Sequence, residues 1–284
     1  MRARSAKSPE LPREILKHYE GVQEQVRLGT QFGQLEFYRT KEIIARHLPK
    51  KRTVILDIGG GPGRYALWLA KLGHTVHLVD PVPVHVEQAR AASDSKRGKR
   101  VSERLASATV GDARSLEFAD ASADTVLLLG PLYHLVKRRD RVRALSEAYR
   151  TLKPGGSLFA AVISRFASSF DGLLRNFVKD AKFFRIVQRD LKDGQHRNPG
   201  NDPRYFTTAF FHHPDELRVE MKEAGFEASQ LYALEGPGWL LANFGQYWSD
   251  PKLRARLLTI IRSVETEPTL MGQSAHILAM ARKS

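Results

Sequence analysis

A glycine-rich loop within residues 53–72 constrains the fold of this chain more than any other stretch. A short apolar run rich in β-branched residues ends at Asp57, and three glycines, a proline and a fourth glycine follow before a helical pattern begins. Tyr65, Leu69 and Leu72 share one face of that helix, which can therefore pack back on the preceding strand. Glycines let a ligand approach the backbone, and a helix N-terminus offers free N–H groups, so we interpret this stretch as a cofactor cradle.

Strands and helices alternate along the chain after the cradle. Such alternation predicts an α/β fold with a doubly wound, mostly parallel sheet that is covered by helices on both faces. Ligands of such a sheet gather beyond the carboxyl ends of its strands. The seven strands are expected over residues 53–57, 75–80, 105–110, 123–129, 157–163, 227–234 and 274–281.

The pattern divides the chain into four segments. Residues 1–52 form an arm and two leading helices, residues 53–163 form the cofactor-binding core, and residues 207–284 complete the core sheet. The intervening residues 164–206 are rich in phenylalanine and arginine and follow the carboxyl end of a strand, so we expect a lid over the ligand side. The two leading helices are expected near residues 13–26 and 37–48.

The composition excludes several classes of protein. Because the chain has no cysteine, it has neither disulfides nor thiolate metal sites nor a cysteine nucleophile, and we expect no metal centre. Its net charge of +14 is spread along the chain, which favours general surface charge over a dedicated nucleic-acid arm. We find neither the roughly 18 apolar residues of a membrane span nor the apolar stretch of a signal peptide, so we expect a cytoplasmic protein.

Two nucleotide cofactors compete for the cradle. The dinucleotide fingerprint G-x-G-x-x-G/A can be forced onto Gly61, Gly63 and Ala66, with Asp80 near the position of its ribose-binding acid. The rival pattern, acid-x-G-x-G-x-G, fits residues 57–63 without adjustment. The second pattern is therefore the more specific match.

From here the sequence resembles the Rossmann-like (class I) S-adenosylmethionine-dependent methyltransferases, firmly over residues 53–163. The resemblance also includes Asp80 after the second strand, Asp112 in G-D-A after the third, and the L-K-P-G-G turn at residues 152–156. It implies S-adenosylmethionine as cofactor, with the ribose hydroxyls on Asp80 and the adenine on Asp112 and the N–H of Ala113. The cofactor-binding residues expected on this basis are Asp57, Gly59, Gly60, Gly61, Gly63, Asp80, Pro81, Asp112, Ala113 and Gly130.

The exit of the fourth strand, G-P-L-Y-H at residues 130–134, bears on the methyl acceptor. Nucleic-acid amino-methyltransferases resemble one another in carrying Asn, Asp or Ser there, followed by Pro-Pro-aromatic. Gly130 and Leu132 depart from that pattern, and the exit is closer to the small-molecule branch that includes quinone-biosynthesis-type enzymes. We predict in-line methyl transfer to a small molecule; methylation of RNA or another nucleic acid, and a non-catalytic cofactor-binding module, stay open. The oligomeric state is open too.

Three residues are the catalytic candidates. His134 follows a central strand and titrates near neutrality, so it is the leading general base, with helix capping as the alternative. Tyr133 is expected to line the acceptor pocket unless it only packs. Of the pair His212 and His213, we expect one to cap the helix that starts at Pro214 and His212 to face the pocket.

Overall fold

The computed structural model of the protein describes residues 31–94, 104–200, 202 and 204–284. Its main strands are β1 (Val54–Ile58), β2 (Thr75–Asp80), β3 (Ser107–Val110), β4 (Ala123–Leu128), β5 (Leu152–Ile163), β8 (Ser229–Ala233) and β9 (His276–Arg282). They form one sheet in the order β3-β2-β1-β4-β5-β9-β8. Strands β1 to β5 run parallel, whereas β9 is antiparallel to both of its neighbours.

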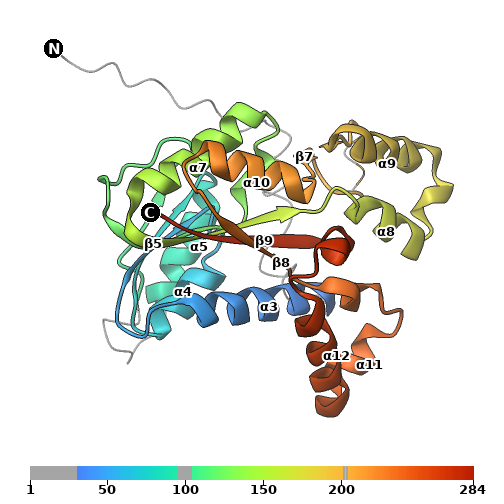
Figure 1. Cartoon of the computed structure of the whole chain (residues 1–284), viewed down its shortest axis with the longest axis horizontal. Coiled ribbons are helices and arrows are strands. Elements are labelled where there is room, and N and C mark those ends of the chain that lie inside the picture. The colour runs from blue at the N-terminus through green and yellow to red at the C-terminus, as the bar shows by residue number, and fades with distance from the viewer. Residues whose placement is uncertain (1–30, 95–103, 201, 203) are drawn as a thin grey trace.

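Helices cover both faces of this sheet (Figure 1). Helices α3 (Gln31–His47), α4 (Arg64–Lys71) and α5 (Pro83–Asp94) pack on one face, and α7 (Arg138–Thr151) and α10 (Pro214–Glu223) pack on the other. Successive side chains of a strand point to opposite faces, so Ile55 packs with the α3–α5 layer and Leu56 with the α7–α10 layer. Both faces are therefore buried, as a parallel sheet requires.

This architecture confirms the doubly wound, mostly parallel seven-stranded sheet predicted from the sequence. Helix α3 begins at residue 31 rather than near residue 37, and the expected first leading helix lies outside the described residues. The expected turn at residues 152–156 belongs to β5, because Leu152 already pairs with Ala123 before the register shifts. Such a bulge lets one strand contain a turn-like segment without leaving the sheet.

The lid segment, residues 164–206, leaves the sheet at the carboxyl end of β5 and returns close by. Ser164 forms a parallel bridge with His212, so the chain departs and re-enters at adjacent points. Figure 1 shows α8 and α9 beyond the end of β5. The elements of this part are α8 (Ala167–Leu174), the 3₁₀ helix η2 (Phe177–Lys179), α9 (Ala181–Asp193) and β6 (Gln195–His196), which pairs with β7 (Ala209–Phe210).

The connection between β8 and β9 is helical. It contains η3 (Gly236–Leu240), α11 (Phe244–Ser249), α12 (Pro251–Val264) and η4 (Pro268–Gln273). Phe244 and Ile261 of this connection pack with Leu35 of α3 in a small apolar cluster, which ties the leading helix to the C-terminal part. Within the described ranges, no helix has both the length and the apolar character needed to cross a membrane.

Candidate active site

The cradle loop between β1 and α4 has room for glycine and for little else. Gly59 has a φ of 68°, and a Cβ there would lie 2.6 Å from Cγ of Pro131. A Cβ on Gly60 would lie 2.7 Å from Oδ2 of Asp57. The loop therefore packs its backbone directly against the exit of β4 and against the acid that ends β1, as a close-fitting ligand loop should.

Asp57 is a buried carboxylate beside this loop. Its residue surface is 1% exposed, and neither carboxylate oxygen accepts a hydrogen bond of ordinary geometry from the described residues, although the N–H of Ala66 is close enough to influence its pKa. Burial raises the pKa of Asp57 to about 7; the backbone N–H of Ala66 opposes that rise and the charge of Asp80 adds to it. An acid kept in this costly state fits a site that receives a cationic group.

A first cavity lies over the cradle, and we call it the Asp57 cavity. Glu36 and Thr40 of α3 close it from one side, and the guanidinium of Arg64 lies 4.4 Å from the ring centre of Phe37 at its edge. Its walls are made by Glu36, Thr40, Asp57, Gly59, Gly60, Gly61, Pro62, Arg64, Tyr65, Leu129, Gly130, Tyr133, Ala161 and Leu234. It thus combines acids and one arginine around the glycine loop.

Asp80 at the end of β2 lines a second cavity, the Asp80 cavity. The N–H of Gly61 donates to Oδ2 of Asp80 at 2.8 Å, and the N–H of Val82 donates to Oδ1 at 2.9 Å. Nδ1 of His85, a residue that sequence analysis missed, lies 3.2 Å from Oδ1. The lining residues are Gly59, Gly61, Asp80, Pro81, Val82, His85, Gly111, Asp112, Ala113, Gly130, Pro131, Tyr133, His134 and Leu135.

Asp112 lies in the same cavity and is held by an arginine that sequence analysis did not single out. Nε and Nη2 of Arg114 approach its two carboxylate oxygens at 2.9 and 2.5 Å, and this hydrogen bonding raises the pKa of Arg114. Arg114 also lies 3.5 Å from Asp140. The backbone N–H of Arg114 also donates to Oδ1 at 2.8 Å. Because a carboxylate offers about four acceptor positions, these three donors orient Asp112 and leave about one position for a ligand.

Residues that follow β4 line the two cavities described above and also a third cavity. A Cβ on Gly130 would lie 3.1 Å from the carbonyl oxygen of Gly59 and 3.7 Å from the hydroxyl oxygen of Tyr133. Tyr133 lines all three cavities. His134 lines the Asp80 cavity, and its ring stacks on that of Phe206 with 6.1 Å between centroids.

The third cavity, the lid cavity, lies between the sheet edge and the lid segment. Aromatic rings dominate it, but it also contains the half-buried Asp171. Burial raises the pKa of Asp171, and the nearby Arg175 opposes this rise. The buried hydroxyl of Ser168 has no hydrogen-bond partner among the described residues. The walls are Tyr133, Ile163, Ala167, Ser168, Asp171, Arg175, Phe183, His196, Arg204, Tyr205, Phe206, Phe211, Trp239, Ala275 and His276.

His212 lies outside the lining of these three cavities, as far as the described residues define them. Its side chain is fully buried, and Nε2 lies 3.3 Å from Oε2 of Glu220, which forms a 2.6 Å ion pair with Arg141. Burial lowers the pKa of His212, and Glu220 opposes that shift. This placement favours a structural role over the predicted catalytic one. His213 caps α10, as expected of one member of the pair.

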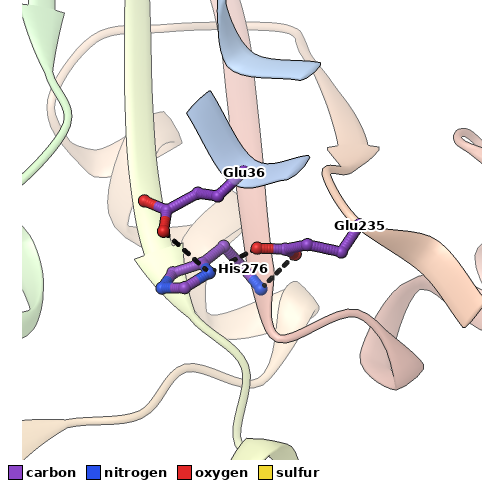
Figure 2. A group of neighbouring side chains, drawn as sticks. All are labelled: Glu36, Glu235 and His276. Carbon is purple, nitrogen blue, oxygen red and sulfur yellow. Dashed lines mark hydrogen bonds and ion pairs between the residues drawn. The ribbon is translucent and has the colours of Figure 1, made fainter. Parts of the chain in front are cut away.

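Sequence analysis also missed a cluster of three side chains at the ligand edge, shown in Figure 2. Glu36 comes from α3, Glu235 follows β8, and His276 is the first residue of β9. The sequence does place polar residues next to the ends of these two strands. Their proximity could not be predicted, because the alternation of elements does not reveal that β9 inserts between β5 and β8.

Comparison with known proteins places this geometry in a family. The family model for a methyltransferase domain matches residues 56–160. The ubiquinone/menaquinone biosynthesis C-methyltransferase UbiE of Rickettsia bellii is 30% identical over 200 residues, which cover 69% of this chain and 77% of the relative. The ubiquinone biosynthesis O-methyltransferase of Azorhizobium caulinodans is 30% identical over 199 residues, 67% of this chain and 68% of the relative.

Solved structures share the fold. An S-adenosylmethionine-dependent methyltransferase from Methanosarcina mazei superposes with a TM-score of 0.56 at 21% identity, over 85% of this chain and 96% of that one. The [4+2]-cyclase SpnF superposes with a TM-score of 0.54 at 19% identity, over 87% of this chain and 81% of that one. At such identities the likeness establishes the fold alone.

The fold and the cradle define the class of this protein, a Rossmann-like (class I) S-adenosylmethionine-dependent methyltransferase. The chain belongs to the quinone-biosynthesis type of these enzymes. It uses S-adenosylmethionine to methylate a small-molecule acceptor. These findings confirm the enzyme class, the cofactor and the small-molecule acceptor predicted from the sequence.

Proposed function

We propose that this enzyme methylates a hydroxylated aromatic ring held in the lid cavity. The observation that carries the proposal is the position of Tyr133, which lines the lid cavity and both cradle cavities. An acceptor beneath the lid segment is thereby brought to the place where the two parts of the cofactor site meet. Rings such as Phe206, Phe211 and Trp239 offer flat apolar walls to an aromatic acceptor.

The residues of the two cradle cavities fit S-adenosylmethionine. We assign its adenosine half to the Asp80 cavity, with the ribose hydroxyls on Asp80 and the adenine beside Asp112 and Ala113. We assign its methionine half to the Asp57 cavity, where the carboxylates of the buried Asp57 and of Glu36 suit an ammonium group and Arg64 suits a carboxylate. When bound, this cofactor supplies a methyl carbon activated by a sulfonium.

The protein has to hold the acceptor in line with the bond that breaks and to exclude water. Tyr133 stands between the cavities beside Gly130, where it can orient the acceptor, and the lid segment supplies several walls of the lid cavity. The general-base role of His134 stays a prediction, and among the described residues His134 lines the Asp80 cavity on the cofactor side rather than the lid cavity. A cytoplasmic location and the absence of specific nucleic-acid binding stay predictions too.

The named relatives support an acceptor of this class. One is described as a C-methyltransferase and another as an O-methyltransferase, and both belong to quinone biosynthesis. The reduced form of a quinone is an aromatic ring that carries two hydroxyl groups. Removing a hydroxyl proton places negative charge on the oxygen and on the neighbouring ring carbons, so either atom can then accept a methyl group.

The test is transfer of label from methyl-labelled S-adenosylmethionine to a panel of phenols, catechols and naphthalenediols. Fully O-methylated analogues of the same rings are the matched controls, and total RNA is included as a competing acceptor. We expect label in hydroxylated rings alone. Label in RNA that survives physiological salt would favour the nucleic-acid alternative, and cofactor binding without any transfer would favour a non-catalytic module.

A further inference from the structure

The topology of the sheet brings Glu235 and His276 to the ligand edge. Because β9 is antiparallel to β5, its first residue, His276, pairs with Ile163, the last residue of β5. Strand β8 is antiparallel to β9 and therefore ends at the same edge, two residues before Glu235. These two side chains thus lie where the parallel strands end, although 41 positions separate them in sequence.

Glu235 fixes the orientation of the His276 ring. Its Oε1 lies 2.6 Å from Nδ1 of His276, and its Oε2 accepts from the N–H of His276 at 2.9 Å and from Oγ of Ser274 at 2.8 Å. The Glu235 side chain is 2% exposed. A carboxylate only accepts hydrogen bonds, so Nδ1 carries the proton and the basic lone pair of the neutral ring resides on Nε2. Figure 2 shows Nε2 on the ring edge away from Glu235.

The cluster of Glu36, Glu235 and His276 lies between the lid cavity, proposed for the methyl acceptor, and the Asp57 cavity, proposed for the methionine half of the methyl donor. His276 lines the lid cavity, while Glu36 lines the Asp57 cavity and has a carboxylate oxygen 4.0 Å from Nδ1 of His276. Two carboxylates therefore face the Nδ1 side of one imidazole. A positive charge that forms on this ring is stabilised by both.

We propose that His276 is the general base of the methyl transfer and that Glu235 is its positioning residue. This inference rests on the proposed function, since it requires an acceptor hydroxyl in the lid cavity. Nε2 of His276 takes the hydroxyl proton, an electron pair released on the acceptor forms the bond to the methyl carbon, and the S–CH₃ bonding pair stays on sulfur as S-adenosylhomocysteine forms. In C-methylation the ring carbon then loses its own proton to water. The imidazolium, 20% exposed, returns its proton to solvent after product release.

The other histidine of the lid cavity is unsuited to this role. Among the described residues, His196 and His276 line that cavity. Nδ1 of His196 lies 2.8 Å from Asp190, and its Nε2 lies 3.2 Å from the carbonyl oxygen of Phe206. Each ring nitrogen of His196 thus already contacts a protein oxygen, so a substrate hydroxyl would have to displace one of these contacts to reach the ring.

A metal site in the same cluster is the main competing interpretation. Glu36, Glu235 and His276 each bring one ligand atom within 4.8 Å of the others. The three hydrogen bonds that Glu235 accepts would have to be broken or shared to coordinate an ion, and Nδ1 would have to lose its proton. The hydrogen-bonded dyad therefore accounts for the contacts with less rearrangement.

The first experiment needs no acceptor. Nitrogen-15 NMR of histidine-labelled protein at pH 8.5, with His276 assigned by comparison with His276→Gln, reports which ring nitrogen carries the proton. We expect the Nδ1–H tautomer, with the Nδ1 proton shifted upfield in Glu235→Gln. A dominant Nε2–H tautomer would overturn the proposal, because Nε2 would then carry a proton and could not accept one from the hydroxyl.

The second experiment uses the hydroxylated ring that gains most label in the panel above. His276→Ala should lower kcat about 10²- to 10⁴-fold with an unchanged dissociation constant for S-adenosylmethionine, and added imidazole should restore part of the rate. Glu235→Gln should lower kcat less. Rescue of His134→Ala but not of His276→Ala would overturn the proposal, and so would loss of activity on chelation that Mg²⁺ or Zn²⁺ reverses. If no ring gains label, the proposed function fails, whereas the tautomer still decides the state of the dyad.

Discussion

The N–H of Gly61 donates to Oδ2 of Asp80 at 2.8 Å, so the cradle loop and the end of β2 hold each other in place. The loop after β1 and the acid after β2 belong to neighbouring parallel strands, whose carboxyl ends meet at one edge. Oδ1 of Asp80 likewise accepts from the N–H of Val82, so both oxygens hold backbone, and the residue also lines the cavity that we assign to adenosine.

Replacing Asp80 by Asn removes its negative charge and keeps its shape. The amide oxygen can still accept from Gly61, but the amide NH2 then faces the N–H of Val82, and the charge that favours the ribose hydroxyls is lost. We expect the dissociation constant for S-adenosylmethionine, measured by calorimetry, to rise at least tenfold, which corresponds to about 1.4 kcal/mol. Asp124→Asn is the matched control, since Asp124 is paired with Lys153 at the opposite end of β4. Equal affinities of Asp80→Asn and the parent protein would remove Asp80 from the cofactor site.

Asp57 should cost stability and contribute to binding. Its pKa of about 7 in the folded protein lies above the ordinary value of 3.8, so the folded state binds more protons than the unfolded state between these values. The free energy of unfolding therefore falls as pH rises from about 4 to 7. Asp57→Asn should remove that fall. At pH 8, its free energy of unfolding, measured by denaturant titration, should exceed that of the parent protein by about 1–3 kcal/mol.

The same substitution should weaken binding of S-adenosylmethionine, because the cationic end of the cofactor loses its buried counter-charge. In the parent protein, the affinity should increase as pH rises through 7, where Asp57 ionises. Calorimetry from pH 5.5 to 8.5 in both proteins measures this. A parent affinity independent of pH, together with an unchanged affinity in Asp57→Asn, contradicts the assignment.

Gly59→Ala and Gly73→Ala distinguish a steric requirement from a conformational one. Both glycines have a positive φ, which an alanine adopts at a cost of about 1–2 kcal/mol. A Cβ on Gly59 would clash with Pro131, whereas a Cβ on Gly73 would meet nothing within 4 Å. Gly73→Ala should lose only that stability and keep its cofactor affinity. Gly59→Ala should lose more of both, and equal effects at the two sites would argue against a close-packed cradle.

His212 should prove structural. His212→Asn removes the contact with Glu220, so the free energy of unfolding should drop by about 1–3 kcal/mol in urea titration. Turnover per folded molecule, measured well below the melting temperature with the best acceptor of the panel, should stay unchanged. A large drop in kcat at preserved stability would instead support the catalytic role that the sequence indicated.

Local patterns made the cradle predictable, and long-range pairing limited the rest. Residues 53–80 contain a strand, its glycine loop, a helix and the next strand in sequence order. The contact of Gly61 with Asp80 follows because the carboxyl ends of neighbouring parallel strands meet at one edge of the sheet. The ion pair of Arg114 with Asp112 is equally local, but carboxylate–arginine pairs two residues apart have no distinctive pattern. His276 and Glu235 meet only because β9 inserts antiparallel into the sheet.

The lid cavity depends on the same kind of long-range assembly. Its walls come from the lid segment, from the exit of β4 and from the connection before β9, and aromatic residues in each could equally have packed in separate cores. The place of Tyr133 after β4 predicts either a pocket residue or a packing residue. Its position at the junction of three cavities required the packing of the lid segment against the sheet edge.

A crystal structure with S-adenosylhomocysteine tests the central claim most directly, because it locates the sulfur from which the methyl group leaves. The account predicts the ribose within hydrogen-bond distance of Asp80, the adenine beside Asp112, the homocysteine end in the Asp57 cavity, and the sulfur facing Tyr133 and the lid cavity. A cofactor bound in the reverse direction, or with its sulfur turned away from the lid cavity, would contradict the account.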